Sequence, residues 1–199
     1  TKQTSWNKLL PAFFSFIVMG FVDIIGVATG YIKLDFELTN FIAQFLPMMV
    51  LLWFFILSVP AGILQDKYGK RNMLNVGMIV QAVGLGLPFL NYSFPMMFAS
   101  FILLGIGNTI IQVSANPLLQ DVSPADKLAS FLSTSQFVKA IISFSGPLIA
   151  TAMASVFGDW KLVLAIYGIT SLLGALWLSL TPIQESKPDR KPASFSSCF

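Results

Sequence analysis

The sequence contains few charged residues and no histidine. Asp, Glu, Lys and Arg make up 11% of the 199 residues, against about 25% in a typical soluble domain, and 55% of the residues are hydrophobic. The shortage of charge excludes an ordinary soluble protein. The lack of histidine excludes serine–histidine intramembrane hydrolases, di-iron oxidases and histidine-ligated haem proteins. The single Cys198 has no partner for a disulfide within the chain. We therefore expect a membrane protein that is not an enzyme and needs no cofactor or metal.

Six long apolar runs dominate what is present. They cover approximately residues 9–32, 42–64, 73–91, 95–118, 129–156 and 161–182, and each is long enough for a bilayer core, which needs about 20 residues. The first run is too long and too aromatic for the apolar part of a signal peptide. Short connections between the runs predict antiparallel neighbours in one bundle. The sequence therefore predicts an all-α membrane protein with six transmembrane helices.

The basic residues predict the orientation of this bundle, because Lys and Arg near helix ends stay on the cytoplasmic side. Only Lys33 and Lys161 fall on one side of the predicted helices. Nine others fall on the opposite side: Lys2, Lys8, Lys67, Lys70, Arg71, Lys127, Lys187, Arg190 and Lys191. We therefore expect both termini in the cytoplasm, and we interpret the net charge of +3 as a topology signal and not as a nucleic-acid site.

The stretch GILQDKYGKR, residues 62–71, lies between the second and third predicted helices. Gly62 would allow two helices to approach closely, Asp66 could complement a helix N-terminus, and Gly69 suits a tight turn. Lys70 and Arg71 would hold the loop on the cytoplasmic side. An ordinary basic loop of a membrane protein is the simpler interpretation of the same residues.

This stretch resembles the signature loop of the major facilitator superfamily, which runs Gly, any, Leu, Ala, Asp, Arg, any, Gly, Arg, then Arg or Lys. Gly62, Leu64, Asp66, Gly69 and Arg71 match, Lys67 and Lys70 are basic substitutions, and Gln65 departs from the pattern. The resemblance implies half of a twelve-helix fold, in which each half consists of two inverted three-helix repeats. It implies that residues 1–183 form the amino-terminal six-helix bundle, and that residues 184–199 form a cytoplasmic linker toward a C-terminal six-helix half.

Within that superfamily, the stretches FVDIIGVATGYIKLDFELTNFIAQF, VPAGILQDKYGKR and GNTIIQVSANPLLQDVSP resemble the fucose:proton symporter family. The resemblance implies proton-coupled symport of a monosaccharide across the cell (inner) membrane. In that family the first helix carries a cavity acid at the place of Asp23, and the fourth helix carries an acid where Gln112 stands. The fifth helix carries a glutamine at the place of Gln136 and often an asparagine at the place of Lys139. Gln136 and Lys139 are therefore expected in the substrate cavity.

Three amides independently point to a polar cavity. Asn108, Gln112 and Asn116 recur at intervals of four residues, which places them along one face of a helix. Amides within the bilayer must face protein or water to be satisfied. Together with aromatic rings such as Trp53 or Tyr31, they would suit an uncharged polyol. Interhelical hydrogen bonding is the alternative for any single amide, and it is the interpretation we favour for the isolated Gln81 of the third helix.

Asp23 is the only one of nine acids that lies within a predicted span. A carboxylate at the centre of a membrane helix costs about 2.5–3.5 kcal/mol on insertion scales, so a role in proton coupling would account for its presence. The alternative is an ion pair with Lys139, the only base within a span. At about 1.5 Å per residue, Asp23 lies roughly 21 Å along the first helix and Lys139 roughly 15 Å along the fifth. Lys139 could instead extend to the membrane surface.

Other functions remain open at this point. A channel would be expected to show a re-entrant filter or a ring of charges, and the sequence has neither feature. A half-sized transporter that works as a homodimer would also have six helices in each chain. A permease for another small polar solute would use the same amides.

Overall fold

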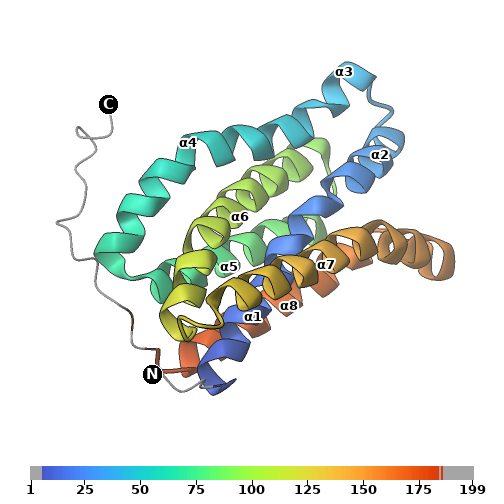
Figure 1. Cartoon of the computed structure of the whole chain (residues 1–199). Coiled ribbons are helices and arrows are strands. Elements are labelled where there is room, and N and C mark those ends of the chain that lie inside the picture. The colour runs from blue at the N-terminus through green and yellow to red at the C-terminus, as the bar shows by residue number, and fades with distance from the viewer. Residues whose placement is uncertain (1–5, 184, 186–199) are drawn as a thin grey trace.

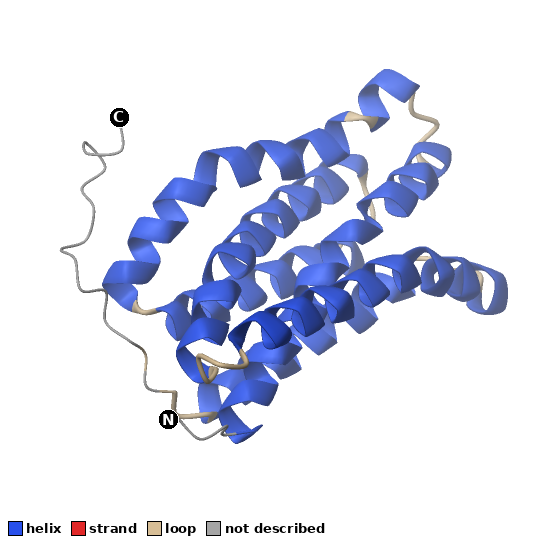
Figure 2. Cartoon of the chain, viewed as in Figure 1, coloured by secondary structure: helices blue, strands red, loops and turns tan. Residues whose placement is uncertain are grey.

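The computed structural model describes residues 6–183 and Glu185, and in this part of the chain every regular element is a helix. The predicted residues 186–199 of the linker, together with Gln184, lie outside the described residues. Figure 2 shows that short loops join the helices. The prediction of an all-helical chain is confirmed for the described residues.

Six helical segments are long and apolar enough to span a membrane, as the sequence predicted. The first comprises α1 (Trp6–Gly20), the 3₁₀ turn η1 (Phe21–Ile24) and α2 (Ile25–Asp35). The second comprises α3 (Asn40–Ala43) and α4 (Phe45–Tyr68), and the third comprises α5 (Lys70–Gly86) and the 3₁₀ turn η2 (Leu87–Phe89). The others are α6 (Phe94–Val122), α7 (Leu128–Phe157) and α8 (Leu162–Leu180). Most segments extend a few residues past the apolar runs, because the polar residues at their ends continue the backbone hydrogen bonding.

Two glycines with positive φ end helices at tight turns. Gly69 has φ +91° and separates α4 from α5 by a single residue. Gly158 has φ +71° in the left-handed region and ends α7. A side chain at either position would be strained. The predicted turn at Gly69 is confirmed.

The centre of the bundle is the pair α5 and α6, and three glycines bring these helices together. A Cβ atom at Gly107 of α6 would lie 2.6 Å from the backbone N of Gln81, and one at Gly77 of α5 would lie 3.0 Å from the backbone O of Gly107. At Gly84, a Cβ would lie 2.8 Å from the Cβ of Leu103. Close approach through small residues is the usual way in which membrane helices associate. Helix α8 packs on the other face of α5, and α1 packs against α6, α7 and α8.

Helices α4 and α7 are the least covered parts of the molecule. In the apolar stretches of these two segments, 17% and 11% of the residues are buried, against 44% or more in the other four. Phe55 of α4 and Phe144 of α7 are 83% and 75% exposed. Figure 1 shows α4 along one edge of the bundle and α7 along another, with α6 between them. We call the side that α4 and α7 border the open face.

The two ends of the bundle differ in charge. Helices α1, α5 and α7 begin and α4, α6 and α8 end at one end, which we call the Lys70 end (Figure 1). The opposite end, which we call the Asp35 end, holds the connections after α2, η2 and α7. Among the described residues the Lys70 end carries Lys8, Lys67, Lys70, Arg71 and Lys127, whereas the Asp35 end carries Lys33 and Lys161. The predicted segregation of basic residues is therefore present in the fold.

Candidate functional site

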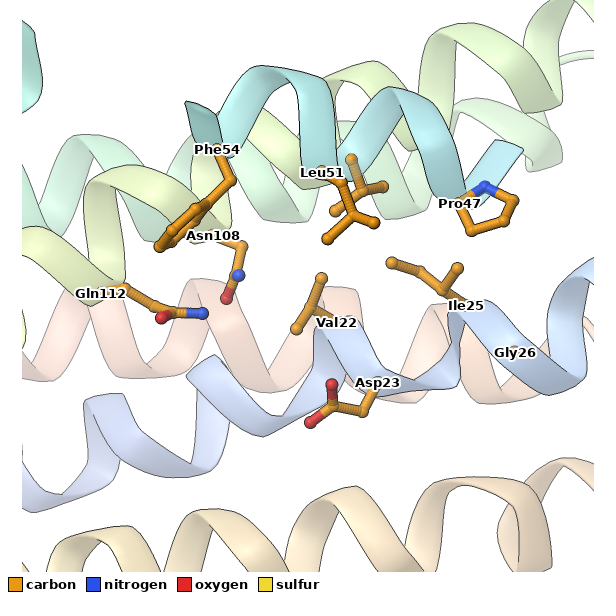
Figure 3. Close-up of a pocket in the computed structure, with 10 residues that line it drawn as sticks. Val22, Asp23, Ile25, Gly26, Pro47, Leu51, Phe54, Asn108 and Gln112 are labelled. Carbon is orange, nitrogen blue, oxygen red and sulfur yellow. The ribbon is translucent and has the colours of Figure 1, made fainter. Parts of the chain in front are cut away.

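The first span is interrupted at Asp23, where η1 replaces one turn of α-helix. Phe21, Val22 and Ile24 are buried in the bundle, so Asp23 is the one residue of this turn that is exposed at the open face. Phe21 stacks on Tyr167 of α8 with ring centroids 3.9 Å apart. These contacts fix the turn, and the carboxylate points from it toward α7 (Figure 3).

Asp23 bonds to a serine and not to Lys139, the alternative partner. The hydroxyl of Ser143 on α7 donates a hydrogen bond to Asp23 Oδ2. Lys139, one turn earlier on α7, forms no ion pair with Asp23 or with any other acid among the described residues. The alternative interpretation, an ion pair between Asp23 and Lys139, is therefore not present in this structure, because Ser143 occupies the position on α7 opposite the carboxylate.

A pocket of about 460 Å³ lies at the open face between η1, α2, α4 and α6. Its polar lining consists of Asp23, Asn108 and Gln112, and Figure 3 shows both amides directed from α6 toward the space. Its apolar lining consists of Val22, Ile25, Gly26, Pro47, Val50, Leu51 and Phe54. A mostly apolar pocket of this size with a few convergent polar groups is typical of small-molecule sites.

Asn108 is the most informative polar residue in this pocket. It is 4% exposed, and its Oδ1 atom has no hydrogen-bond partner within the described residues. A buried carbonyl oxygen without a donor costs about 1–3 kcal/mol. The Asn108 amide therefore retains unused hydrogen-bonding capacity at the edge of the pocket.

The other two predicted cavity amides do not line this pocket. Asn116 Oδ1 accepts a hydrogen bond from Gln136 Nε2 at 3.3 Å, and Asn116 Nδ2 donates to the backbone O of Gln112 at 3.4 Å. The first bond connects α7 to α6 closer to the Lys70 end, and the second lies within α6. Of the predicted cavity residues, Asn108 and Gln112 thus line the pocket, whereas Asn116 and Gln136 bridge two helices. Lys139 is half-buried and lies one turn beyond Gln136 on α7.

The aromatic residue beside the pocket is Phe54, which the sequence analysis did not single out. Tyr31 stacks on Trp160 with ring centroids 5.2 Å apart, and the Cβ of Trp53 lies near Gly105 of α6. Neither Tyr31 nor Trp53 is among the residues that line the pocket. The expectation that these two rings contact the substrate is not supported, because their positions around the helix axes direct them elsewhere.

Gln81 forms an interhelical hydrogen bond, as the simpler of its two interpretations predicted. Its Nε2 donates a hydrogen bond to the backbone O of Val18 at 2.9 Å, and the side chain is fully buried. It therefore joins α5 to α1 and does not line the pocket.

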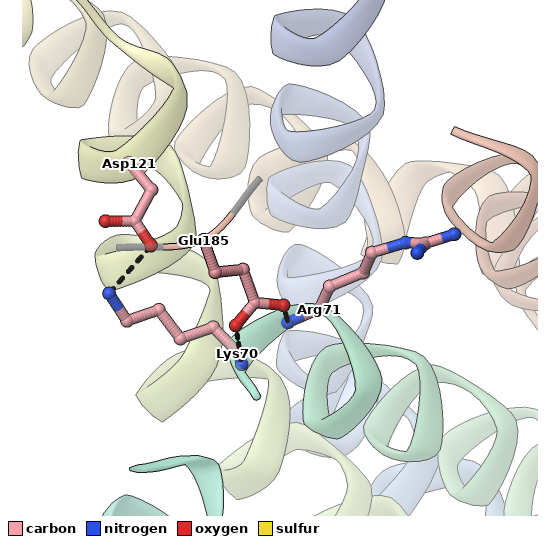
Figure 4. A network of polar contacts seen from close by, with 4 residues as sticks. All are labelled: Lys70, Arg71, Asp121 and Glu185. Atoms are coloured by element: carbon pink, nitrogen blue, oxygen red, sulfur yellow. Dashed lines mark hydrogen bonds and ion pairs between the residues drawn. The ribbon is translucent and has the colours of Figure 1, made fainter. Parts of the chain in front are cut away.

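Two of the predicted loop residues, Lys70 and Arg71, form a polar network at the Lys70 end (Figure 4). The carboxylate of Glu185 accepts hydrogen bonds from the backbone N of Lys70 at 2.6 Å and of Arg71 at 2.9 Å. Lys70 Nζ pairs with Asp121 of α6 at 2.7 Å. The Arg71 side chain donates to the backbone O atoms of Leu178, at 3.0 Å, and Ser179 of α8. The beginning of α5 is thereby fixed to the ends of α6 and α8.

Two residues of this loop differ from expectation. Asp66 lies in the last turn of α4, exposed, and forms no side-chain hydrogen bond or ion pair with the described residues. It therefore does not cap a helix N-terminus through a side-chain hydrogen bond in the described part of the chain. Gly62 is not at a close approach, because the nearest atom to an added Cβ would be Val113 Cγ1 at 4.0 Å.

A second network joins the three connections at the Asp35 end. Asp35 Oδ2 accepts hydrogen bonds from the Tyr92 hydroxyl and from Trp160 Nε1, the latter at 3.0 Å. Lys161 Nζ lies 4.1 Å from the centroid of the Tyr92 ring and 3.1 Å from Asp159 Oδ1. Burial, and then the hydrogen bond to Asp35, raise the pKa of Tyr92 above its usual value of 10.0.

Comparisons with known proteins agree with this architecture. The sequence model of the Major Facilitator Superfamily matches residues 12–197. A protein named glucose/galactose transporter from Brucella abortus is 27% identical over 147 residues, which are 72% of this chain and 34% of that protein. The uncharacterized transporter YycB of Bacillus subtilis is 26% identical over 181 residues, covering 88% of this chain and 44% of YycB. The facilitated glucose transporter member 12 of solute carrier family 2 from Homo sapiens is 22% identical over 119 residues, covering 60% and 19%. The chain thus spans less than half the length of these curated relatives.

Proposed function

This chain belongs to the major facilitator superfamily, and we propose that it is the amino-terminal half of a secondary transporter that carries a monosaccharide together with protons. The coarser part of this statement, a multi-pass membrane transporter and not an enzyme, follows from the family and from the six spanning helices. The substrate, the coupling ion and the second half are the proposal.

The pocket beside Asp23 is the observation that carries the proposal. It combines a buried amide oxygen without a partner in the described residues, a second amide and one carboxylate, all on the open face. Amides recognise hydroxyl groups by donating and accepting hydrogen bonds. The apolar remainder of the pocket, including Phe54, suits the C–H face of a sugar ring. The relatives named as glucose or glucose/galactose transporters support a sugar as the solute.

Asp23 is proposed as the proton-coupling group. It is the only acid in the middle of a spanning segment among the described residues, and it is exposed at the open face beside the pocket. With no histidine in the sequence, a proton carrier built on this half needs a carboxylate. Access to water would favour the ionised form, and closure around the substrate would favour the neutral form.

The open face is proposed to pack against a C-terminal six-helix half. Exposed apolar side chains along α4 and α7 provide the contact surface. In transporters of this kind, one half rocks against the other around a site between them. The Lys70 end is proposed to face the cytoplasm, since it holds five of the seven basic residues described at the two ends, and the membrane is proposed to be the cell (inner) membrane.

The test is Asp23→Asn in the complete transporter, with Asp126→Asn in the exposed loop before α7 as the matched control. We expect the Asp23 variant to lose uphill accumulation of labelled glucose or galactose but to retain exchange across the membrane, because the amide resembles the protonated acid. The control should accumulate sugar as the wild type does. Uphill accumulation by the Asp23 variant that a protonophore still dissipates would show that the proton is carried elsewhere.

A second test concerns the two halves. Membrane vesicles that contain only residues 1–199 should not accumulate sugar, and co-expression of the second half should restore uptake. Uptake by residues 1–199 alone, together with cross-links between two copies along α4 and α7, would favour the homodimer instead.

A further inference from the structure

Ser143 lies opposite Asp23 and has two acceptors within reach. Its hydroxyl donates to Asp23 Oδ2 and also lies 3.0 Å from the backbone O of Lys139, one turn earlier on α7. A hydroxyl carries one hydrogen, so it donates to one of these acceptors at a time, while its oxygen can accept a bond from a further donor.

We propose that Ser143 is a positioning residue that keeps a hydrogen bond to Asp23 in both protonation states of the carboxyl group. When Asp23 is ionised, Ser143 donates to it. When Asp23 takes a proton from water at the open face, its new O–H donates to Ser143 Oγ, and the serine hydrogen turns to the backbone O of Lys139. Release of the proton to water reverses both changes, so no other group gains or loses a proton. This inference rests on the proposed role of Asp23 in proton coupling.

The packing around this pair keeps the two side chains together. A Cβ at Gly20 would lie 3.0 Å from the backbone O of Lys139 and 2.9 Å from Ile142 Cγ2, so the backbone of the first span lies directly against α7. On the other side, Phe21 stacks on Tyr167 of α8. Protonation therefore reverses the direction of a hydrogen bond between the first and fifth spans without a change in backbone position.

Other hydroxyl groups of α7 bond differently. Ser145 donates to the backbone O of Ile142 at 2.8 Å, and Thr151 donates to the backbone O of Pro147 at 2.9 Å. These bonds remain within α7, as is usual for serine and threonine inside a helix. The bond from Ser143 to another span is specific to its position, and Ser145 provides a matched control.

The charged and titratable groups near this pair are few. Within the described part of the chain, Lys139 is the only charged residue in the middle of an element that packs against η1. The others on these elements lie toward the helix ends: Lys8 on α1, Tyr31, Lys33 and Asp35 on α2, and Asp121 on α6. On α8, Tyr167 stacks with Phe21. A pH dependence that changes with Ser143 but not with Ser145 therefore reports on Asp23 and its partner.

The test measures the pH dependence of sugar exchange and of accumulation in the complete transporter. In Ser143→Ala, we expect the pH midpoint to move upward by roughly 0.5–1 unit, because the ionised carboxylate has lost a donor. Sugar affinity at low pH should stay within about twofold, since Ser143 does not line the pocket. Ser143→Thr keeps the hydroxyl and should restore the wild-type midpoint, and Ser145→Ala should leave it unchanged.

The outcomes separate this inference from the proposed function. If Asp23→Asn abolishes accumulation but Ser143→Ala leaves the midpoint unmoved, the positioning role is refuted and the proposed function stands. If Asp23→Asn still accumulates sugar, the proposed coupling itself is refuted. Should Ser143→Ala fail to fold, Ser143→Cys keeps a group of similar size with a weaker donor. It should move the midpoint in the same direction by less, and an unmoved midpoint in that variant would equally overturn the role.

Discussion

Gly107→Ala tests the close contact between α5 and α6 that forms the centre of the bundle. The added Cβ would lie 2.6 Å from the backbone N of Gln81 and 2.8 Å from the backbone O of Gly77. Both neighbours are backbone atoms, so no side-chain rotation can relieve the overlap. An ordinary contact starts at 3.4 Å, so the two helices would have to separate locally by about 0.8 Å.

The magnitude follows from two opposing effects. Replacing glycine by alanine inside a helix gains about 1 kcal/mol of helix propensity. Overpacking of a close contact costs about 1–3 kcal/mol, and a purely backbone contact belongs at the upper end of that range. Separation of the helices would also loosen the bond from Ser100 Oγ to the backbone O of Gly84, which is 2.6 Å long. We expect a net loss of roughly 1–2 kcal/mol in the free energy of unfolding.

Gly86→Ala is the matched control, because no atom lies within 4 Å of an added Cβ at that position of α5. The measurement is equilibrium unfolding in mixed detergent micelles, followed by helical circular dichroism. The control should be as stable as the wild type or slightly more stable. A Gly107 variant as stable as the Gly86 variant would refute the backbone contact and the helix spacing described here.

Three further perturbations probe the ends of the bundle. Glu185→Gln should lower the free energy of unfolding by about 0.5–2 kcal/mol, because the amide offers one acceptor oxygen to the two backbone N–H groups of Lys70 and Arg71. Unchanged stability in the same detergent titration would contradict this cap. The wild type should lose stability above pH 10, because the raised pKa keeps the Tyr92 phenol neutral in the folded state while it ionises in the unfolded state. In Tyr92→Phe this loss should be smaller. Equal slopes of the unfolding free energy against pH in variant and wild type would argue against the reasoning. Asp66→Asn in the complete transporter should slow transport and leave sugar affinity within about twofold, because Asp66 lies at the Lys70 end and outside the pocket. A large loss of sugar affinity with an unchanged transport rate would instead place Asp66 in the cavity.

Hydropathy alone predicted the six spans, because the bilayer imposes a length and an apolar character that are visible without any tertiary contact. The unusual position of Asp23 was visible for the same reason. Its partner was not, because a serine in a helix usually bonds to its own backbone, and only the rotation of α7 against η1 turns Ser143 toward the acid. Lys139 attracted attention through its charge, yet it lies one turn away from the contact.

The amides show the same limit in another way. A spacing of four residues correctly placed Asn108 and Gln112 together at the pocket. It could not separate them from Asn116, because the boundary between pocket and bridge depends on where Gln136 of the neighbouring helix meets α6. Phe54 and Trp53 are adjacent in sequence, and only the direction in which α4 faces α6 decides which ring borders the pocket.

The networks at both ends favour movement of the bundle as a rigid body. Asp35 joins three connections at one end, and Lys70 with Arg71 joins three helices at the other, so side-chain contacts hold the bundle together at both ends. Helix α7 has 30 residues and is therefore about 45 Å long. A tilt of about 10° around its midpoint would displace its two ends by roughly 4 Å in opposite directions. In the proposed assembly with a second half, a gap that widens at the Lys70 end would narrow at the Asp35 end, and the displacement would be smallest near the Asp23 pocket.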